Sequence, residues 1–345
     1  MSLISEIHEQ PQILQNLFDS QSNEIRKIAE QINAYNPHYV FLAARGTSDN
    51  AGRFANYLWG AHNHFPLALA TPSLFTFYEQ PPHLKDALVV GISQSGMSPD
   101  ILAVIEEGRR QKSLTLAITN APNSPLAQAA DLHINICAGE EKAVAATKSY
   151  TAQLMVIAML SAGLSANQAD WNDLARVATW AQEVLDHPQQ LADYAQRYTF
   201  MDRCVVLGRG YNYATAFEWA LKLKELTYTI AEPYSSADFL HGPVAMVDRN
   251  FPVLAVAPQG KIFENILDVI KQLKEKQQAE LVVISNNPEA LKIANIAIKI
   301  PGAVPEWLTP IIAIIPGQLF AYHLTEARGF NSESPRTINK VTRTH

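Results

Sequence analysis

The chain has 345 residues, of which 48% are hydrophobic and 17% charged, and its formal net charge is −6. This length predicts two domains, and the acidic balance without a run of Lys and Arg argues against nucleic acid as a partner. The N-terminus lacks the features of a signal peptide and the apolar runs are short, so we expect a cytoplasmic protein with no membrane segment. Only Cys137 and Cys204 occur, and we interpret both as core residues rather than as a disulfide framework.

The predicted elements alternate between helices and strands. A helical segment is expected over residues 1–30, interrupted near Pro11. Short apolar runs with little alternation predict strands buried on both faces at residues 39–43, 87–92, 114–118 and 132–136. Apolar residues at helical spacing between Ala51 and Trp59 predict an amphipathic helix after the first strand. This order predicts βαβ units and a parallel sheet, in which ligands bind at the carboxyl ends of the strands.

The first half of the chain recurs 164 residues later. FLAARG at 41–46 matches VVLGRG at 205–210, LVVGI at 88–92 matches PVLAV at 252–256, and DLHINI at 131–136 matches NIAIKI at 295–300. Matches in one order and at one offset indicate a tandem duplication. We therefore predict an α/β protein with two doubly wound, flavodoxin-like parallel-sheet domains, at 31–165 and 195–330. A helical linker is expected at 166–194 and a C-terminal tail at 331–345.

The two copies differ in their loops. After the second strand, copy one has SQSGMS at 93–98, where copy two has APQGKI at 257–262. The hydroxyl groups, a glycine and a helix start with Ser98 as N-cap and Pro99 at the first helical position predict a phosphate site. A turn with a good helix cap explains the same residues and stays open as an alternative.

Two further segments of copy one lie at predicted strand ends. RGTSDN at 45–50 contains Thr47 and Ser48, whereas copy two has tyrosines and an asparagine at the corresponding loop. These two hydroxyls are expected beside the serine-rich loop. The small residues around Val144, in AVAATK at 143–148, allow a close approach to a ligand, but they are equally compatible with helix packing.

Candidate catalytic groups occur in copy two. Glu218, Lys222 and Glu225 have the spacing of one helix face over residues 214–229, which is typical of a solvated, salt-bridged face or of a buried catalytic group. His241 precedes Gly242 and Pro243 and can titrate near neutral pH, although a structural role is the alternative. The histidines show no metal-ligand spacing, so neither a metal nor a cofactor is expected.

Six short motifs occur together in one order: RGTS at 45–48, SQSG at 93–96, VAATK at 144–148, LKLKE at 221–225, HGP at 241–243 and KVT at 340–342. From about Glu6 to its end, the chain therefore resembles the double sugar isomerase (SIS) family. It is most similar to the isomerase half of glucosamine-6-phosphate synthase and to stand-alone SIS deaminases. The resemblance implies two tandem SIS domains that bind a sugar phosphate.

The resemblance also implies roles for matching residues. Glu225 would move a proton between C1 and C2, Lys340 would form a Schiff base with the open sugar, and His241 would assist ring opening from the neighbouring subunit of a homodimer. The phosphate would be held by Ser93, Gln94, Ser95 and Ser98. The remaining substrate contacts would come from Thr47, Ser48, Val144, Lys222 and Asn339, the last of which stands where the synthase has alanine.

The expected reaction follows from a departure from the synthase. The sequence begins at the sugar-handling half, with no glutaminase domain before it, so we expect a deaminase that converts glucosamine 6-phosphate and water to fructose 6-phosphate and ammonia. A fructosamine-6-phosphate deglycase and an aldose–ketose isomerase are the alternatives among enzymes. A non-catalytic sugar-phosphate sensor is the alternative of another class, although such sensors carry a helix-turn-helix domain that this chain has no room for.

Overall fold

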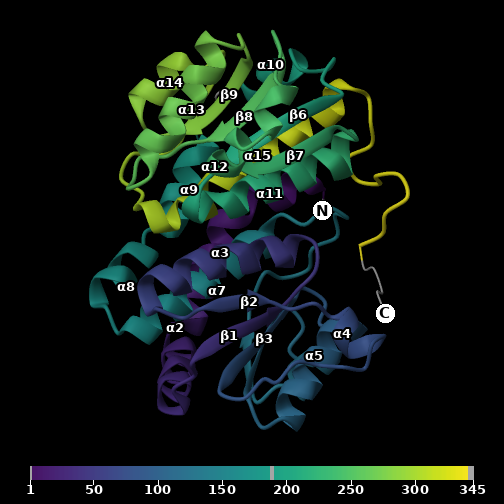
Figure 1. The fold of residues 1–345 in the computed structure, drawn as a ribbon, viewed down its shortest axis with the longest axis vertical. Coiled ribbons are helices and arrows are strands. Elements are labelled where there is room, and N and C mark those ends of the chain that lie inside the picture. The colour runs from purple at the N-terminus through teal and green to yellow at the C-terminus, as the bar shows by residue number, and fades with distance from the viewer. Residues whose placement is uncertain (1, 187–189, 341–345) are drawn as a thin grey trace. The chain divides into compact units, whose positions relative to one another are not determined.

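The computed structural model describes residues 2–186 and 190–340, and in these ranges it contains two five-stranded parallel sheets (Figure 1). The strand order is β2-β1-β3-β4-β5 in the first sheet and β10-β9-β8-β6-β7 in the second. The strands of the first sheet are β1 (Tyr39–Ala43), β2 (Leu67–Leu69), β3 (Ala87–Ser93), β4 (Leu114–Thr119) and β5 (Leu132–Asn135). Those of the second are β6 (Arg203–Gly208), β7 (Ile230–Ser235), β8 (Pro252–Val256), β9 (Glu280–Ser285) and β10 (Ile296–Lys299). The predicted α/β fold with two tandem parallel sheets is confirmed.

The chain forms two compact units, each built around one sheet. The first-sheet unit comprises Gln12–Glu141, Lys148–Arg176 and the tail from Asn339; the second-sheet unit comprises the residues up to Pro11, Lys142–Thr147 and Val177–Ile338. The short segment Lys142–Thr147 therefore packs with the second sheet, although it lies between elements of the first. The domain boundaries expected from the repeat stay predictions, and residues 187–189 and 341–345 of the expected linker and tail lie outside the described residues.

Helices flank both sheets. In the first-sheet unit they are α3 (Thr47–Asn63), α4 (Ser73–Thr76), α5 (Pro99–Arg110), α6 (Pro125–Ala129), α7 (Lys148–Ser165) and α8 (Gln168–Leu174), and most of α2 (Gln10–Tyr35) belongs here. The second-sheet unit has α1 (Leu3–His8), α9 (Val177–Asp186), α10 (Leu191–Gln196), α11 (Tyr213–Lys222), α12 (Ser236–Leu240), α13 (Phe263–Glu275), α14 (Pro288–Ile293) and α15 (Thr309–Ala327). Single turns complete it: the 3₁₀ turns η1 (Gly210–Asn212), η3 (Pro243–Met246) and η4 (Glu306–Leu308), and the π-helical turn η2 (Leu223–Thr227).

The leading helix is interrupted close to the predicted position. The break between α1 and α2 falls at Glu9, and Pro11 lies in the first turn of α2. Proline is tolerated there because the first N–H groups of a helix have no partner inside the helix. The predicted interruption is confirmed, two residues earlier than the proline itself.

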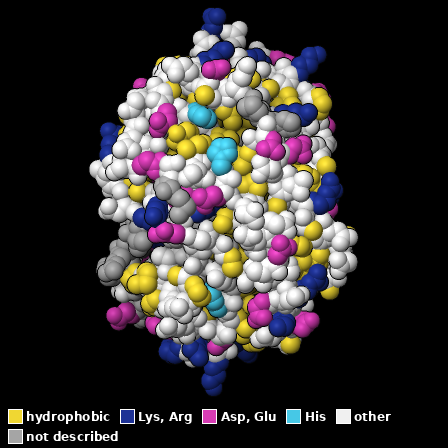
Figure 2. Space-filling view, turned by 180° about the vertical axis from the view of Figure 1, so that it is seen from behind, with side chains coloured by type: hydrophobic (Ala, Val, Ile, Leu, Met, Phe, Trp, Pro, Cys, Tyr) yellow, Lys and Arg dark blue, Asp and Glu magenta, His cyan; other side chains and the backbone are white. Residues whose placement is uncertain are grey.

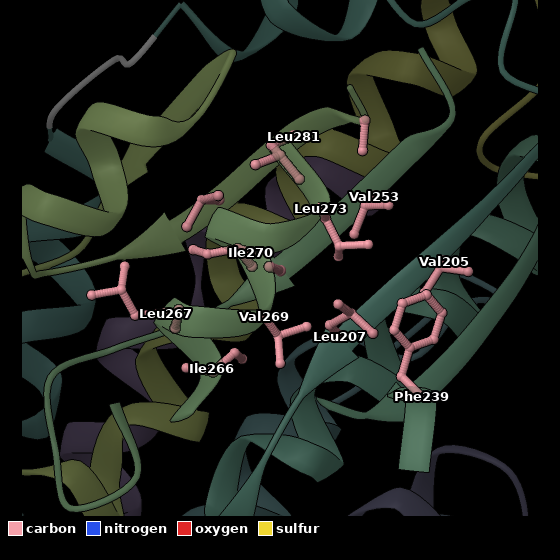
Figure 3. Packing of buried hydrophobic residues seen from close by; sticks show 14 of the residues in the cluster. Val205, Leu207, Phe239, Val253, Ile266, Leu267, Val269, Ile270, Leu273 and Leu281 are labelled. Atoms are coloured by element: carbon pink, nitrogen blue, oxygen red, sulfur yellow. The ribbon is translucent and has the colours of Figure 1, made fainter. Parts of the chain in front are cut away.

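Amphipathic helices bury their apolar faces on the sheets. In α13, the apolar residues Ile266, Leu267, Ile270 and Leu273 recur at helical spacing and are at most 2% exposed. They pack against strand residues that include Val205, Val253 and Leu281 (Figure 3). In the first-sheet unit, α5 packs against β3 and β4 in the same way. This packing fixes the start of α5 at the carboxyl end of β3, where the serine-rich loop lies.

Helix α15 is apolar on all sides. The span Glu306–Ala327 is long and hydrophobic enough to cross a membrane, but 89% of its most apolar window is buried in the protein. Phe320 packs edge-on against Trp219 of α11, and Gly317 provides the space for that indole ring. Its composition is that of a core helix enclosed by neighbouring elements.

Charged side chains of both signs are interspersed on the face shown in Figure 2. Figure 2 shows one face, on which neither the basic nor the acidic side chains form a continuous field. A nucleic-acid backbone requires an extended basic track, and that face does not offer one. The expectation that nucleic acid is not a partner stays a prediction.

Candidate functional site

The serine-rich loop at residues 93–98 joins β3 to α5. The hydroxyl of Ser93 accepts a hydrogen bond from the backbone N–H of Gly96 at 3.1 Å, and Ser95 accepts one from Met97 at 3.3 Å. Ser98 is the N-cap residue, as predicted, but its hydroxyl accepts no capping bond and lies 3.5 Å from that of Ser93. The predicted N-cap residue is therefore confirmed, and its hydroxyl group lies beside that of Ser93.

A glycine makes this turn possible. Gly96 has a φ of +63°, in the left-handed region that favours glycine. A side chain at this position would also collide with Ser124. Gln94 is half-buried, and its backbone carbonyl accepts a hydrogen bond from the N–H of Asn120. The loop is thus held by the bond from Asn120 and by bonds from its own backbone to Ser93 and Ser95, and its hydroxyl groups lie at the carboxyl end of the sheet.

The first turn of α3 carries Thr47 and Ser48. Its N-cap is Gly46, with a φ of +53°. Ser48 is 8% exposed, and its hydroxyl accepts a hydrogen bond at 3.0 Å from the side-chain amide of Gln153 on α7. Since β1 and β3 are parallel neighbours, this turn and the serine-rich loop leave the same edge of the sheet.

Val144 lies in the segment Lys142–Thr147, which buried side chains hold from both ends. The carboxylate of Glu6, 0% exposed, accepts hydrogen bonds from the backbone N–H groups of Lys142 at 2.6 Å and of the next residue at 3.3 Å. At the other end, the side-chain amide of Gln318 donates to the carbonyl of Thr147 at 3.4 Å. The backbone around Val144 is therefore fixed by α1 and α15, two elements that the sequence motif does not include.

Glu225 lies in the π-helical turn η2, next to a buried cation. The ammonium group of Lys222 is 2.5 Å from the carboxylate of Glu225 and 3.3 Å from that of Glu218. Lys222 and Glu218 are 1% and 0% exposed, so the solvated-face alternative is wrong for them. Burial by itself lowers the pKa of Lys222, but the two carboxylates raise it above its ordinary value. The lysine is thus a fixed positive charge that orients Glu225.

Glu225 also lines a cavity of about 390 Å³. The cavity lies between η2 and β7 on one side and residues 336–338 of the tail on the other. The tail is attached there by Arg336, whose guanidinium group stacks on the ring of Tyr228 at 3.9 Å and whose backbone N–H donates to the Tyr228 hydroxyl at 2.9 Å. The side chain of Glu225 is 24% exposed and lines this space.

Lys340 is held by a buried carboxylate. Its ammonium group is 2.6 Å from Glu141, whose side chain is 0% exposed. Ser149 donates to the same carboxylate through its hydroxyl at 2.7 Å and through its backbone N–H at 3.1 Å. Asn339 beside it is exposed. Glu141 was missed by the sequence analysis because its partner lies 199 residues away in the chain.

His241 is exposed at the C-terminal end of α12. Across residues 2–186 and 190–340, no group of three or more His, Cys, Asp or Glu side chains has a geometry that could hold a metal ion. What the structure assembles from these residues is a set of hydroxyls at one sheet edge and, in the other unit, a carboxylate oriented by a buried lysine.

The predicted site residues are thus distributed over both units. Those of the first-sheet unit are Thr47, Ser48, Ser93, Gln94, Ser95, Ser98, Asn339 and Lys340. Those of the second-sheet unit are Val144, Lys222, Glu225 and His241. The supporting residues Glu6, Glu141, Gln153 and Gln318 were not predicted to have a role, since only their contacts in the fold reveal one.

Comparison with known proteins identifies relatives along the whole chain. The model of the SIS domain matches residues 35–162 and 201–327. The glutamine–fructose-6-phosphate aminotransferase (isomerizing) of Thermococcus kodakarensis is 32% identical over 348 residues, which cover 98% of this chain but only 57% of that relative. The C-terminal domain of the Francisella tularensis glucosamine-fructose-6-phosphate aminotransferase superimposes with a TM-score of 0.86 at 26% identity, covering 96% of this chain and 98% of that one. A glucosamine-6-phosphate deaminase from Thermotoga maritima shares the fold, with a TM-score of 0.79 at 19% identity over the whole of both chains.

Proposed function

This chain belongs to the SIS domain family, and on that premise we propose that it is a sugar-phosphate isomerase-type enzyme that deaminates glucosamine 6-phosphate. The observation that carries the proposal is the carboxylate of Glu225, held 2.5 Å from the buried Lys222 and open to a cavity. A positioned carboxylate of this kind is a general base, which contributes about 10²–10⁴ in rate to a proton transfer.

The phosphate is assigned to the serine-rich loop. Ser93, Ser95 and Ser98 offer hydroxyl donors, and Gln94 offers a side-chain amide, at the carboxyl end of β3. The start of α5 adds the positive end of a helix dipole, which favours an anion. Thr47, Ser48, Asn339 and the backbone at Val144 are assigned to the hydroxyl groups of the sugar.

The proposed reaction begins on the open-chain sugar. Glu225 removes the proton from C2, and the resulting enol-amine is protonated at C1, which leaves a C=N double bond at C2. Water adds to C2 and ammonia leaves, so the products are fructose 6-phosphate and ammonia. His241, supplied by the second copy of a cytoplasmic homodimer, is assigned to ring opening. Lys340 is assigned to a Schiff base with the open sugar at C2, through which this hydrolysis proceeds: its amine displaces ammonia from the C=N carbon, and water then hydrolyses the lysine imine to the C2 ketone and the free lysine.

The choice of an amino sugar rests on the relatives. The name of the Thermococcus protein combines an amino-group transfer to fructose 6-phosphate with an isomerisation. The proposed reaction connects the same ketose phosphate to its 2-amino aldose by an exchange of a proton between C1 and C2. It requires water as the second substrate and no nitrogen donor.

The test is to incubate the protein with glucosamine 6-phosphate and to measure ammonia and fructose 6-phosphate together. Equal release of both supports the proposal, and Glu225→Gln should reduce it by at least about 100-fold. Glu232→Gln is the matched control, since Glu232 lines the same cavity from β7 and is exposed.

Other outcomes would replace the proposal. Interconversion of glucose and fructose 6-phosphates without ammonia would make the protein an aldose–ketose isomerase. Release of an amino acid from a fructosamine 6-phosphate would make it a deglycase. Binding of these compounds without turnover would make it a sensor.

A further inference from the structure

Asp100 presents a problem for an anion site in the serine-rich loop. It lies in the first turn of α5, directly after the loop, and its side chain is 0% exposed. A buried carboxylate beside a phosphate would repel it, unless another charge cancels the carboxylate. The structure provides that charge on the neighbouring strand.

Arg45 is the cation that compensates Asp100. Its Nε is 2.7 Å from one carboxylate oxygen of Asp100, and the other oxygen accepts a hydrogen bond from the backbone N–H of Ile101 at 2.9 Å. The carboxylate is therefore fixed on both sides. The guanidinium group is thus held beside the carboxylate through its Nε.

The remaining nitrogens of Arg45 are available. In the described part of the chain, the two terminal Nη atoms form no hydrogen bond with the protein. The Arg45 side chain is 50% exposed. Asp49 is the other acidic group near it, and the carboxylate of Asp49 is itself 3.1 Å from Arg53. The N–H groups on the Nη atoms of Arg45 thus donate a hydrogen bond neither to Asp100 nor to Asp49.

The strand register places Arg45 next to the serine-rich loop. Strands β1 and β3 are parallel neighbours (Figure 1), and Ala43 is opposite Gly91 in their register. Two residues further along each chain come Arg45 and Ser93, and neighbouring strands are only about 4.8 Å apart. The arginine and the first serine of the loop therefore leave the same edge of the sheet side by side.

The second copy of the fold serves as an internal control. At the same offset it has Arg209 and Glu264, so the arginine and an acidic residue are both retained. These two side chains form no ion pair in the described structure. The loop at 257–262, which corresponds to the serine-rich loop, has no hydroxyl group. The fixed arginine thus accompanies the hydroxyl-bearing loop and is not a general requirement of the fold.

We propose that Arg45 binds the phosphate dianion of the substrate through its Nη atoms and makes the site selective for phosphorylated sugars, while Asp100 positions it. The inference rests on the assignment of the phosphate to the serine-rich loop in the proposed function. Arginine suits this task because its planar fork of N–H groups matches two phosphate oxygens at once.

The test uses binding rather than turnover. Wild-type protein is titrated calorimetrically with glucitol 6-phosphate, which has no carbonyl group and cannot react, and with glucitol as the unphosphorylated control. In the double variant Arg45→Met/Asp100→Asn, which removes both charges and leaves no isolated buried carboxylate, the Kd for glucitol 6-phosphate should rise about tenfold or more. Arg209→Met, the matched change in copy two, should leave it within about twofold.

The outcomes separate this inference from the proposed function. If wild type binds glucitol 6-phosphate and the folded double variant binds it equally well, Arg45 has no role in phosphate binding. Loss of binding in the double variant supports the role of Arg45 even if the protein does not deaminate glucosamine 6-phosphate. If wild type binds no phosphorylated sugar, the assignment of the phosphate is wrong and the role of Arg45 with it. Asp100→Asn alone should weaken binding less than the double change, since it frees Arg45 without removing it.

Discussion

Replacing Lys222 by methionine tests whether the buried ammonium group stabilises the carboxylates of Glu218 and Glu225 in the folded protein. The ammonium group lies 3.3 Å from Glu218 and 2.5 Å from Glu225, and the lysine side chain is 1% exposed. Methionine has a similar unbranched shape, so the change removes the charge and little of the packing. Breaking a buried ion pair from one side lowers the free energy of unfolding by about 3–5 kcal/mol, and that is the loss we expect at pH 8.

The assay is urea unfolding of wild type and Lys222→Met, with Lys271→Met as the control. Lys271 is 2.6 Å from Glu289, but the two side chains are 37% and 55% exposed. Removing a lysine from an exposed pair lowers the free energy of unfolding by about 0–1 kcal/mol. The two lysine pairs have similar lengths, but one is buried and the other exposed. We therefore expect the loss of unfolding free energy to be several-fold larger for Lys222→Met than for Lys271→Met.

The difference in unfolding free energy between wild type and Lys222→Met should also depend on pH, and it should decrease only on the alkaline side. Burial lowers the pKa of Lys222, but Glu225 and Glu218 raise it above its ordinary value. Its stabilising charge is therefore fully present below the unfolded-state pKa of about 10.4 and is lost as the pH rises through the higher folded-state value. The deficit of the variant should shrink only above about pH 10.

One result would refute this reasoning. If Lys222→Met and Lys271→Met both lose less than about 1 kcal/mol, the buried carboxylates do not depend on the lysine. A second variant identifies the cause. Adding Glu218→Gln to Lys222→Met should recover part of the loss, because it removes one of the buried negative charges.

Two further predictions concern the tail and a buried thiol. Lys340→Ala breaks the 2.6 Å ion pair with the buried carboxylate of Glu141, so we expect both turnover and the melting temperature to fall; unchanged turnover of the folded variant would assign the tail a purely structural role. Burial raises the pKa of Cys204 to about 12, so the free energy of unfolding should fall by up to about 1.4 kcal/mol per pH unit from about pH 8.5 upward. Cys204→Ala should lack this part of the alkaline decline in urea titrations, and an identical decline in both proteins would contradict the assignment.

The fold could be predicted because its signals are local. A strand buried on both faces of a parallel sheet shows as an apolar run, and the runs at residues 39–43, 87–92, 114–118 and 132–136 correspond to β1, β3, β4 and β5 within one residue. The 164-residue repeat then predicted the second sheet from the first. The serine-rich loop was recognisable for the same reason, since copy two shows what the fold requires without hydroxyl groups.

The surroundings of the candidate groups could not be predicted, because they depend on distant residues. The spacing of Glu218, Lys222 and Glu225 is the same on a solvated helix face and in a buried cluster. Only the packing of α11 against α15 decides between the two. Equally, no pattern near Lys340 indicates Glu141, and no pattern near Val144 indicates that Glu6 binds the adjacent backbone.

The duplication explains how one scaffold supports two different loops. Gln153 on α7 and Gln318 on α15 occupy matching positions in the two copies, 165 residues apart, and both are buried. The amide of Gln153 donates to the hydroxyl of Ser48, whereas that of Gln318 donates to the backbone carbonyl of Thr147. The same helical position thus carries a buried amide in both copies. In copy one this amide binds the Ser48 side chain, and in copy two it binds the backbone at Thr147. At this helical position the donor is retained, while its acceptor differs between the copies.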